Sequence, residues 1–342
     1  MERIGIVGGG SFGSALADII GTRGVPVSLW FRKPEIADEF NLLHENKRYL
    51  PGFSLSSNIT ATSNLEEASR GCSLILVCVP SKYFRPIARR LSEWVDGSQI
   101  LVSTTKGIES HTFKLMTEIL REETSCLKIG ALSGPNLAKE IAAKVPSGTV
   151  IASRYDEVIE SVQKALSCSY FRVYSSRDVQ GVELGGVLKN IYAIAIGLVS
   201  ALQMGDNTRG MLLTRGLAEM SRFAESFGAN PMTFLGLSGV GDLVATSSSS
   251  LSRNYRVGYL IGQGKNLQEA VREVGDVAEG VHTVEVVYEK ARELGIDMHI
   301  LFGLHALLFE GKDLPTVLKD LMSVPQMEDV EFSHRFKGEE NG

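Results

Sequence analysis

Short apolar runs alternate with segments of helical periodicity through the first half of the chain. The strand candidates are Arg3–Val7, Val27–Phe31, Leu74–Val79, Gln99–Ser103, Lys128–Leu132 and Gly148–Ala152. Their nearly continuous apolar character is typical of parallel strands buried on both faces. Helical segments lie between them, for example Ser14–Thr22, Tyr83–Trp94 and Thr112–Glu123. This alternation predicts a doubly wound α/β fold with a parallel sheet.

From about Val179 onward the strand signals stop and longer helical periodicities follow. The expected helices are Gly181–Met204, Met211–Phe227, Asn254–Gln263, Leu267–Val274, Thr283–Leu294 and Ile300–Phe309. Pro315 and Pro325 bracket a last short helix, and the serine run Ser247–Ser250 is expected to be a loop. We therefore predict an α/β domain over residues 1–178, an all-helical domain over 179–335 and a polar tail over 336–342.

Composition narrows the class of protein. A chain of 342 residues is too long for one ordinary core, so two domains are expected. The net charge of -5 does not favour binding to nucleic acid or to an anionic membrane. The uncharged stretch Asn190–Met204 is shorter than the ~20 residues of a membrane span. Four cysteines without a CxxC pair and six scattered histidines predict reduced thiols, no metal site and a cytoplasmic protein.

A glycine-rich loop follows the first strand candidate. Gly8, Gly10 and Gly13 have the G-x-G-x-x-G spacing and lead directly into a helix. The first glycine permits a tight turn, the second lets the backbone approach a pyrophosphate, and the third lets helix and strand pack closely. The helix N-terminus would present free N–H groups to the phosphates. A Rossmann-type dinucleotide site is therefore favoured over a purely structural glycine turn.

The second strand candidate ends in a pair of cations, Arg32 and Lys33. A site selective for NAD(H) usually places Asp or Glu there, on the ribose 2′-hydroxyl, whereas a cation suits the 2′-phosphate of NADP(H). Glu35 lies slightly too late for the first role. The pattern favours NADP(H), with NAD(H) also possible. An ordinary exposed pair of loop residues is the structural alternative.

Polar residues follow the later strand candidates, at the edge where open α/β sheets bind ligands. Lys106 lies between threonines and a glycine after the fourth candidate, and Gly134 and Asn136 follow the fifth. A lysine at this position could hold an anionic or carbonyl-bearing substrate. Gly134 and Asn136 would bring backbone and an amide into the same crevice.

Lys189 is the most unusual residue of the helical half, because it lies in the most apolar helical stretch, Gly181–Gly197. Burial disfavours the charged ammonium, so we expect its pKa to fall unless a carboxylate compensates. A lysine with a tunable proton is a candidate general acid or base, and Asp242 is a plausible partner. The structural alternative is a lysine whose ammonium reaches water from the edge of the helix.

Ser252, Arg253 and Asn254 open a later helix and have the residue types of an anion site. A hydroxyl, a bidentate guanidinium, an amide and a helix N-terminus would all be available there. Plain N-capping is the structural alternative for Ser252 and Asn254.

At these residues the chain resembles bacterial-type NAD(P)-dependent glycerol-3-phosphate dehydrogenases, from Ile4 to about Met327. The most specific stretches are Ser103–Glu109 (STTKGIE), Gly134–Glu140, Gly181–Asn190 (GVELGGVLKN), Thr214–Met220 (TRGLAEM), Gly239–Asp242, Ser252–Asn254 and Ala278–Gly280. The resemblance implies reversible reduction of dihydroxyacetone phosphate to sn-glycerol 3-phosphate for phospholipid synthesis. It also implies a homodimer.

The resemblance further implies roles for single residues. Lys189, beside Asp242, would donate and accept the proton at the substrate oxygen, and Lys106 would add positive charge there. Together with the motifs above, it predicts a substrate site of Lys106, Gly134, Asn136, Lys189, Asp242, Ser252, Arg253 and Asn254. The predicted cofactor site comprises Gly8, Gly10, Ser11, Phe12, Gly13, Arg32, Lys33, Lys106, Ala138, Arg253, Val277 and Glu279.

Three positions depart from the family pattern. Gly9 and Phe12 stand where alanine and tryptophan are common, and Asn136 stands where threonine or serine is common. We expect these three changes to affect only the details of ligand contacts, because the residues present keep the side-chain size or the hydrogen-bonding ability that the site needs.

Two other functions are considered. A 6-phosphogluconate or β-hydroxyacid type of dehydrogenase shares the two halves and a helical lysine, but the GVELGGVLKN, GVGD and SRN stretches favour the glycerol-phosphate enzyme. A non-catalytic dinucleotide-binding sensor is disfavoured because Lys106, Lys189, Asp242 and Arg253 are all present.

Overall fold

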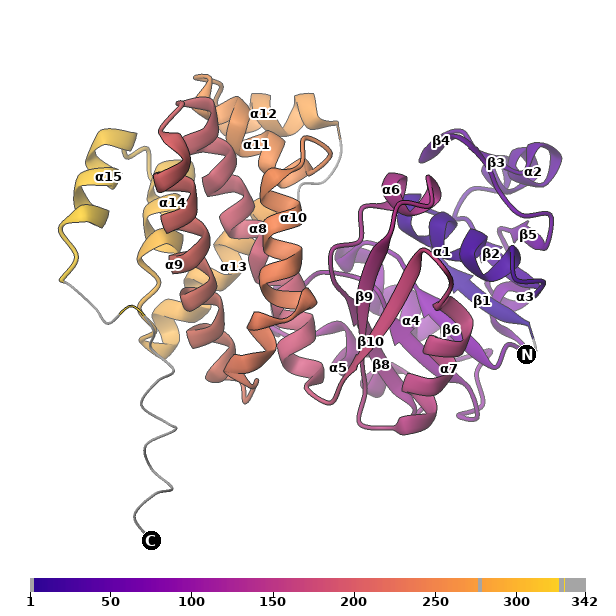
Figure 1. The fold of residues 1–342 in the computed structure, drawn as a ribbon. Coiled ribbons are helices and arrows are strands. Elements are labelled where there is room, and N and C mark those ends of the chain that lie inside the picture. The colour runs from indigo at the N-terminus through magenta and orange to yellow at the C-terminus, as the bar shows by residue number, and fades with distance from the viewer. Residues whose placement is uncertain (1–2, 276–278, 326–328, 330–342) are drawn as a thin grey trace, which may run out of the picture. The chain divides into compact units, whose positions relative to one another are not determined.

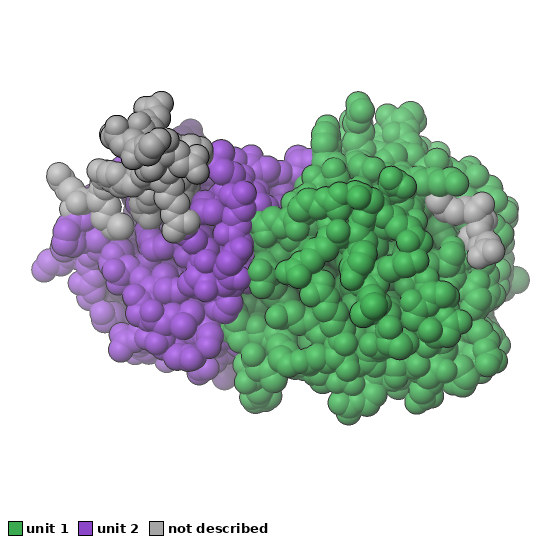
Figure 2. Space-filling view, turned by 90° about the horizontal axis from the view of Figure 1, so that it is seen from below, with its two compact units in different colours: residues 1–183 green, residues 184–342 purple. Residues whose placement is uncertain are grey.

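The computed structural model describes residues 3–275, 279–325 and 329. The chain divides into two compact units, Met1–Glu183 and Leu184–Gly342. Figure 1 labels the elements, and Figure 2 colours the two units. The first unit contains the sheet, and the second is helical wherever it has regular structure among the described residues.

The first unit is built on an eight-stranded sheet formed by residues in the described range. The strand order is β10-β9-β8-β7-β6-β1-β2-β5. The strands are β1 (Ile4–Val7), β2 (Val27–Trp30), β5 (Ile59–Thr62), β6 (Leu74–Val77), β7 (Ile100–Ser103), β8 (Ile129–Ser133), β9 (Ser147–Ala152) and β10 (Phe171–Ser176). A separate hairpin comprises β3 (Glu45–Asn46) and β4 (Leu50–Ser54). The strand order reverses next to β1, which is where doubly wound folds bind their ligands.

Helices cover both faces of this sheet (Figure 1). They are α1 (Ser11–Gly21), α2 (Pro34–Leu43), α3 (Leu65–Ser69), η1 (Ser81–Tyr83), α4 (Phe84–Leu91), α5 (Met116–Glu123), α6 (Ala138–Ala142) and α7 (Asp156–Leu166). On one face α1 and α7 bury Leu16 and Val158 against the strands. On the other face α4 and α5 bury Ile87 and Ile119. Burial on both faces explains the continuous apolar runs, and the predicted fold class is confirmed.

The sheet is not wholly parallel. The strand predicted at Gly148–Ala152 is present, but its predicted parallel direction was wrong. This strand, β9, pairs with β8 in the antiparallel sense, and β10 then pairs with β9 in the parallel sense. The connecting helix α6 has 5 residues and so spans only about 7.5 Å. That is too short to return along a strand of about 17 Å, so the chain re-enters the sheet from the same edge. The beginning of β9 therefore lies where β7 and β8 end.

Strands β5 and β10 and the β3–β4 hairpin were not predicted. The first two are the edges of the sheet, where buried and exposed side chains mix along the strand. They lack the continuous apolar run that identifies central strands. The hairpin includes Pro51 and Gly52, which are unusual inside strands.

The second half of the chain is helical, as predicted. Its helices are α8 (Val179–Ala201), α9 (Gly205–Glu225), η2 (Pro231–Leu235), η3 (Leu237–Gly241), α10 (Asp242–Ser248), α11 (Arg253–Gly262), α12 (Leu267–Val274), α13 (Glu279–Leu294), α14 (His299–Phe309) and α15 (Leu314–Met322). The prediction of a loop was wrong for Ser247 and Ser248, which end α10. Burial of Thr246 and Ser247 holds this last turn helical despite the low helix propensity of serine.

Helix α8 is buried along most of its length, because every residue from Gly181 to Val199 is buried. It is long and apolar enough to cross a membrane by length and composition, with a mean hydropathy of 1.6. However, 89% of that window is buried inside the protein, which accounts for its apolar composition. A Cβ on Gly258 of α11 would lie 1.8 Å from the Ile194 carbonyl oxygen, so this glycine lets α11 approach the α8 backbone.

Candidate active site

The glycine-rich loop connects β1 to α1. Gly8 has a φ of +124°, and a Cβ there would lie 2.7 Å from the backbone of Cys78. A Cβ on Gly13 would lie 2.1 Å from the Gly8 carbonyl oxygen, so packing requires both glycines. A Cβ on Gly10 would meet nothing within 4 Å. Gly10 therefore borders open space, and its lack of a side chain leaves room for a phosphate to approach.

The N-terminus of α1 is suited to an anion. Gly10 is its N-cap and supplies no side-chain hydrogen bond, and the first turn contains no acidic residue. The amides of Ser11, Phe12 and Gly13 have no acceptor within the helix, by helix geometry. These donors, at the positive end of the helix dipole, fit the diphosphate of a dinucleotide.

The β3–β4 hairpin packs against the glycine-rich loop. The sequence analysis did not predict this contact. The buried Asn46 side chain donates to the Gly9 carbonyl oxygen at 2.9 Å and to Ser14 Oγ at 2.8 Å. Ser11 Oγ donates to the Tyr49 carbonyl oxygen at 2.5 Å. No spacing rule connects these residues with the glycines, so the local sequence carried no signal for them.

The two predicted cations have different surroundings. The Arg32 guanidinium lies 5.5 Å from the ring centroid of Tyr83 in η1. Lys33 forms an ion pair with Glu35 at 3.6 Å, and both side chains are exposed. Arg32 and Lys33 therefore contact different groups in this structure.

Phe12 and Ala138, two further predicted cofactor residues, lie on the same side of the sheet. Phe12 belongs to the first turn of α1, and Ala138 begins α6. Both are partly buried against one apolar cluster of the first unit.

Lys106, Gly134 and Asn136 come together, as predicted from their positions after β7 and β8. Lys106 Nζ donates to the Gly134 carbonyl oxygen at 2.8 Å. Asn136 Nδ2 donates to Thr149 Oγ1 at 3.0 Å, and that hydroxyl donates to the Ser133 carbonyl oxygen at 3.0 Å. Thr149 lies on β9 and was missed, because its place here depends on the antiparallel return of that strand.

This cluster has spare capacity for hydrogen bonds. Asn136 Oδ1 and Ser133 Oγ are buried atoms with no hydrogen-bond partner in the part of the chain that the structure describes. Buried polar atoms in proteins are normally paired. The cluster is therefore suited to a ligand with polar groups.

The loop that carries Lys106 is anchored three residues later. Arg85 of α4 donates to both carboxylate oxygens of Glu109, at 2.6 and 2.8 Å, and to Glu123 at 2.6 Å. These carboxylates raise the pKa of Arg85, and Arg85 lowers the pKa of Glu109. Bidentate geometry of this kind fixes the orientation of both groups.

Lys189 is buried beside Asp242, with 7% and 2% of their side chains exposed. Lys189 Nζ lies 2.6 Å from Asp242 Oδ1 and also donates to Thr246 Oγ1. Thr246 Oγ1 in turn donates to Asp242 Oδ1 at 3.2 Å. Asp242 thus supplies the carboxylate that a buried lysine needs. The structural alternative, in which the Lys189 ammonium reaches water, does not describe this buried side chain. Thr246 was missed by the sequence analysis.

Close packing of α8 explains this arrangement. A Cβ on Gly185, one turn before Lys189, would lie 2.5 Å from the Ser238 carbonyl oxygen. The turn η3 therefore packs directly on α8, and α10 begins beside it at Asp242. Because Asp242 and Thr246 are four residues apart, they share one face of α10. Ser247 Oγ, in the next position, is buried without a hydrogen-bond partner among the described residues.

The start of α11 contains both structural and exposed groups. Ser252 caps the helix, and its Oγ accepts from the Tyr255 amide at 3.2 Å. Asn254 is buried, and its Oδ1 accepts from the Gly280 amide at 3.1 Å. The capping alternative therefore describes Ser252, whereas Asn254 joins α11 to α13. Arg253 is exposed.

Two predicted cofactor residues precede or begin α13. Glu279 is its first residue. Val277 lies outside the described residues.

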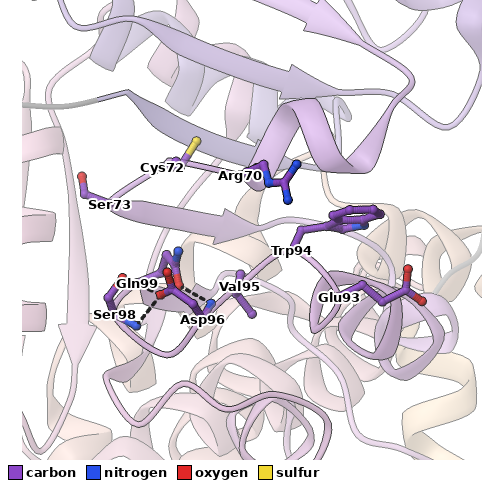
Figure 3. Close-up of a pocket in the computed structure, with 10 residues that line it drawn as sticks. Arg70, Cys72, Ser73, Glu93, Trp94, Val95, Asp96, Ser98 and Gln99 are labelled. Atoms are coloured by element: carbon purple, nitrogen blue, oxygen red, sulfur yellow. Dashed lines mark hydrogen bonds between the residues drawn. The ribbon is translucent and has the colours of Figure 1, made fainter.

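A separate hollow of about 480 Å³ opens at the opposite edge of the sheet (Figure 3). Ser73 and Gln99, which line it, precede β6 and β7, and the Arg70 guanidinium lies 5.7 Å from the Trp94 ring centroid. Open α/β sheets bind ligands at the carboxyl ends of their strands. This hollow, at the amino ends, is therefore not the dinucleotide site.

Comparison with protein families identifies both halves of the chain. Residues 3–159 match the model for the N-terminus of NAD-dependent glycerol-3-phosphate dehydrogenase, and residues 178–319 match the model for its C-terminus. A glycerol-3-phosphate dehydrogenase (NAD(P)+) of Alcanivorax borkumensis is 50% identical over 327 residues, 96% of this chain and 95% of the relative. One from Teredinibacter turnerae is 49% identical over 330 residues, 96% and 97% of the two chains.

Solved structures of similar proteins have the same architecture. A glycerol-3-phosphate dehydrogenase from Coxiella burnetii superposes with a TM-score of 0.89 at 34% identity, covering 94% of this chain and 99% of that one. A glycerol-3-phosphate dehydrogenase from Plasmodium falciparum has a TM-score of 0.89 at 26% identity, with coverages of 96% and 97%.

Proposed function

Because the chain belongs to the family of NAD-dependent glycerol-3-phosphate dehydrogenases, we propose that Lys189 transfers the proton in the reaction it catalyses. That reaction is the reversible reduction of dihydroxyacetone phosphate to sn-glycerol 3-phosphate with NADPH or NADH. The family resemblance predicted from the sequence is thereby confirmed. The observation that carries the proposed role of Lys189 is its burial against Asp242 and Thr246.

The first unit is proposed to bind the cofactor, which supplies a hydride to the substrate carbonyl carbon when bound. The open side of the loop at Gly10 and the uncapped N-terminus of α1 support this role, because together they form a cradle for a diphosphate. Ser11 and Phe12 present their amides there, and Arg32 lies at the end of β2, where the adenosine ribose binds in this fold.

Lys189 then acts at the substrate oxygen. Hydride addition to a carbonyl leaves an alkoxide that needs a proton, and the Lys189 ammonium donates it. In the reverse direction the neutral amine accepts the proton from the substrate hydroxyl. Asp242 stabilises the ammonium, and Thr246 holds its orientation through hydrogen bonds to both groups.

The remaining predicted residues are proposed to position the substrate. Lys106 adds positive charge at the developing alkoxide, while Gly134 and Asn136 supply polar groups beside it. The unpaired oxygen of Asn136 supports this assignment, because substrate hydroxyls can donate to it. Arg253 is proposed to bind the phosphate, since its exposed guanidinium stands at a helix N-terminus.

Steady-state kinetics tests the function directly. Purified protein is assayed for oxidation of NADPH and, separately, NADH in the presence of dihydroxyacetone phosphate. Matched assays of NADP+ or NAD+ reduction use sn-glycerol 3-phosphate or 6-phosphogluconate. We expect turnover with the two glycerol-derived substrates only. Turnover with 6-phosphogluconate alone would contradict the proposal.

We also propose a cytoplasmic location. The four cysteines are free thiols, two of them fully buried, which suits a reducing compartment. The homodimer rests on family resemblance alone and stays a prediction.

A further inference from the structure

Two cations flank one aromatic ring at the carboxyl edge of the sheet. Arg32 follows β2, and its guanidinium lies 5.5 Å from the Tyr83 ring centroid. Lys82 lies in η1, the turn after β6, and its Nζ is 4.8 Å from the same centroid. Strand β1, which leads into the glycine loop, lies between β2 and β6 in the sheet. The two cations therefore come from both neighbours of the strand that carries the diphosphate cradle.

No carboxylate neutralises this pair in the part of the chain that the structure describes. Each ion pair found there involves other residues, including the neighbouring Lys33, which is held by Glu35. Both cations lie over the Tyr83 ring, and the proximity of Lys82 and Arg32 to the phenol lowers the pKa of Tyr83. Two like charges at one phenol repel each other, and an anion placed beside them would relieve that repulsion.

The position of these cations indicates which anion. In doubly wound folds the ribose of the adenosine half lies at the end of the second strand, next to the glycine loop. Arg32 occupies that place. The group that a bound dinucleotide would present there is the substituent at the ribose 2′ position, a hydroxyl in NAD(H) and a phosphate in NADP(H).

We propose that Lys82, together with Arg32, binds the 2′-phosphate of NADP(H) and makes this chain selective for NADP(H) over NAD(H). The inference rests on the proposed cofactor site of the first unit. Lys82 is named as the second cation because it lies against the same Tyr83 ring as Arg32, whereas Lys33 lies beside Glu35. Tyr83 positions the two side chains, since both cations lie over its ring.

Binding of substrate-free nucleotide fragments tests the proposal without relying on activity. Titration calorimetry compares adenosine 2′,5′-bisphosphate with adenosine 5′-monophosphate on the wild type, Lys82→Ala and Arg32→Ala. Lys128→Ala is the matched control, because Lys128 is paired with Glu157 at 2.8 Å and precedes β8 at the opposite edge of the sheet. Melting temperatures show whether each variant is folded, and Lys82 is exposed, so its removal leaves no cavity.

We expect Lys82→Ala and Arg32→Ala each to weaken binding of the bisphosphate roughly tenfold, the effect of losing one hydrogen bond to a charged group. Binding of the monophosphate should stay within twofold of the wild type, and Lys128→Ala should change neither. For the whole cofactors, Lys82→Ala and Arg32→Ala should weaken binding of NADPH, which has the 2′-phosphate, and should change binding of NADH little.

Equal losses for both fragments, or an unchanged affinity of Lys82→Ala for the bisphosphate, would overturn the assignment. In either case wild-type turnover of dihydroxyacetone phosphate would leave the proposed function standing. Failure of the folded wild type to bind any of these nucleotides would overturn the proposed function as well.

Discussion

At the scale of single residues, the Lys189–Asp242 pair is better evidence for function than for stability. Taking an ammonium and a carboxylate out of water costs several kcal/mol per ion, and replacement by apolar residues is often neutral or stabilising. The Lys189 and Asp242 side chains are only 7% and 2% exposed, so stability alone does not explain why this ion pair is buried. Proton transfer at a desolvated substrate oxygen supplies one.

We expect Lys189→Ala to lower kcat for dihydroxyacetone phosphate ~10²–10⁴-fold, the usual contribution of a general acid or base. NADPH binding should persist, because the proposed cofactor cradle does not include this residue. Stopped-flow or steady-state absorbance measures the first quantity, and fluorescence titration measures the second.

A companion variant separates chemistry from folding. Lys189→Ala leaves Asp242 buried without its cation, which can destabilise the protein by about 3–5 kcal/mol. The double variant Lys189→Met with Asp242→Asn removes both charges and should melt at a higher temperature than Lys189→Ala. It should remain inactive. Near-wild-type turnover in either variant would refute the role of Lys189.

Some residue-level features could be predicted, and others could not. The Lys189–Asp242 pairing followed from residue types, because a buried lysine needs a carboxylate. Thr246 and Thr149 were missed because small hydroxyls are common and nothing local distinguishes the two that converge on a site. The departure at Gly9 has a physical reason that only the structure provides. A Cβ there would lie 2.2 Å from the Phe31 ring.

At the scale of elements, the loop after β7 owes its position to α4. Arg85 holds Glu109 by two hydrogen bonds and Glu123 by a third. Thr105 adds a hydrogen bond from its hydroxyl to the Val79 carbonyl oxygen at 2.6 Å. Lys106 lies between these two anchors. Arg85 is therefore a positioning residue, although it does not touch Lys106.

We expect Arg85→Gln to lower kcat/KM for dihydroxyacetone phosphate about 10–100-fold, because small displacements of positioning groups are costly. The loss should appear mainly in KM if Lys106 binds substrate. The pH profile of kcat should keep its shape, because the proton-transfer group is untouched. Arg89→Ala is the control, since its largely exposed side chain binds only Glu123 among the partners found in the described structure. Equal behaviour of the two variants would exclude the positioning role.

Strand direction is the element-level property that the pattern of apolar residues could not supply. The run Gly148–Ala152 was correctly identified as a strand, but burial on two faces is compatible with either direction. The deciding feature is the length of α6, which became clear only when its 5 residues were seen as a helix. The edge strands β5 and β10 were not predicted for a related reason: buried and exposed residues mix along them, as they do in exposed loops.

At the scale of the whole molecule, a buried glutamate caps a helix in each unit, Glu183 in the first and Glu219 in the second. Glu183 accepts hydrogen bonds from the Thr117 amide, at 3.0 Å, and from its hydroxyl, at the start of α5. Glu219 accepts from the Ile300 amide at 2.8 Å, at the start of α14, and from the Tyr192 hydroxyl at 3.0 Å. Burial raises the pKa of Glu183 and of Glu219 to about 7.

These two carboxyls should make the protein less stable as the pH rises through the window from about 4.5 to 7. Both are protonated in the folded and the unfolded chain below pH 4.5, so their contribution is fully present there. Between 4.5 and 7 the unfolded chain releases a proton that the folded chain retains, and the free energy of unfolding falls. Above 7 the folded protein must hold a buried carboxylate, and the contribution is lost.

Glutamine substitution isolates this effect from the many other carboxylates. Glu183→Gln and Glu219→Gln cannot ionise, and a glutamine can still accept from the helix amides. The difference in melting temperature, variant minus wild type, should therefore rise between pH 5 and pH 8 for each variant, by an amount corresponding to roughly 1–3 kcal/mol. Glu160→Gln, at an exposed position of α7, should show a flat difference. A difference that falls with pH would mean that the helix amides stabilise the carboxylates more than burial opposes them.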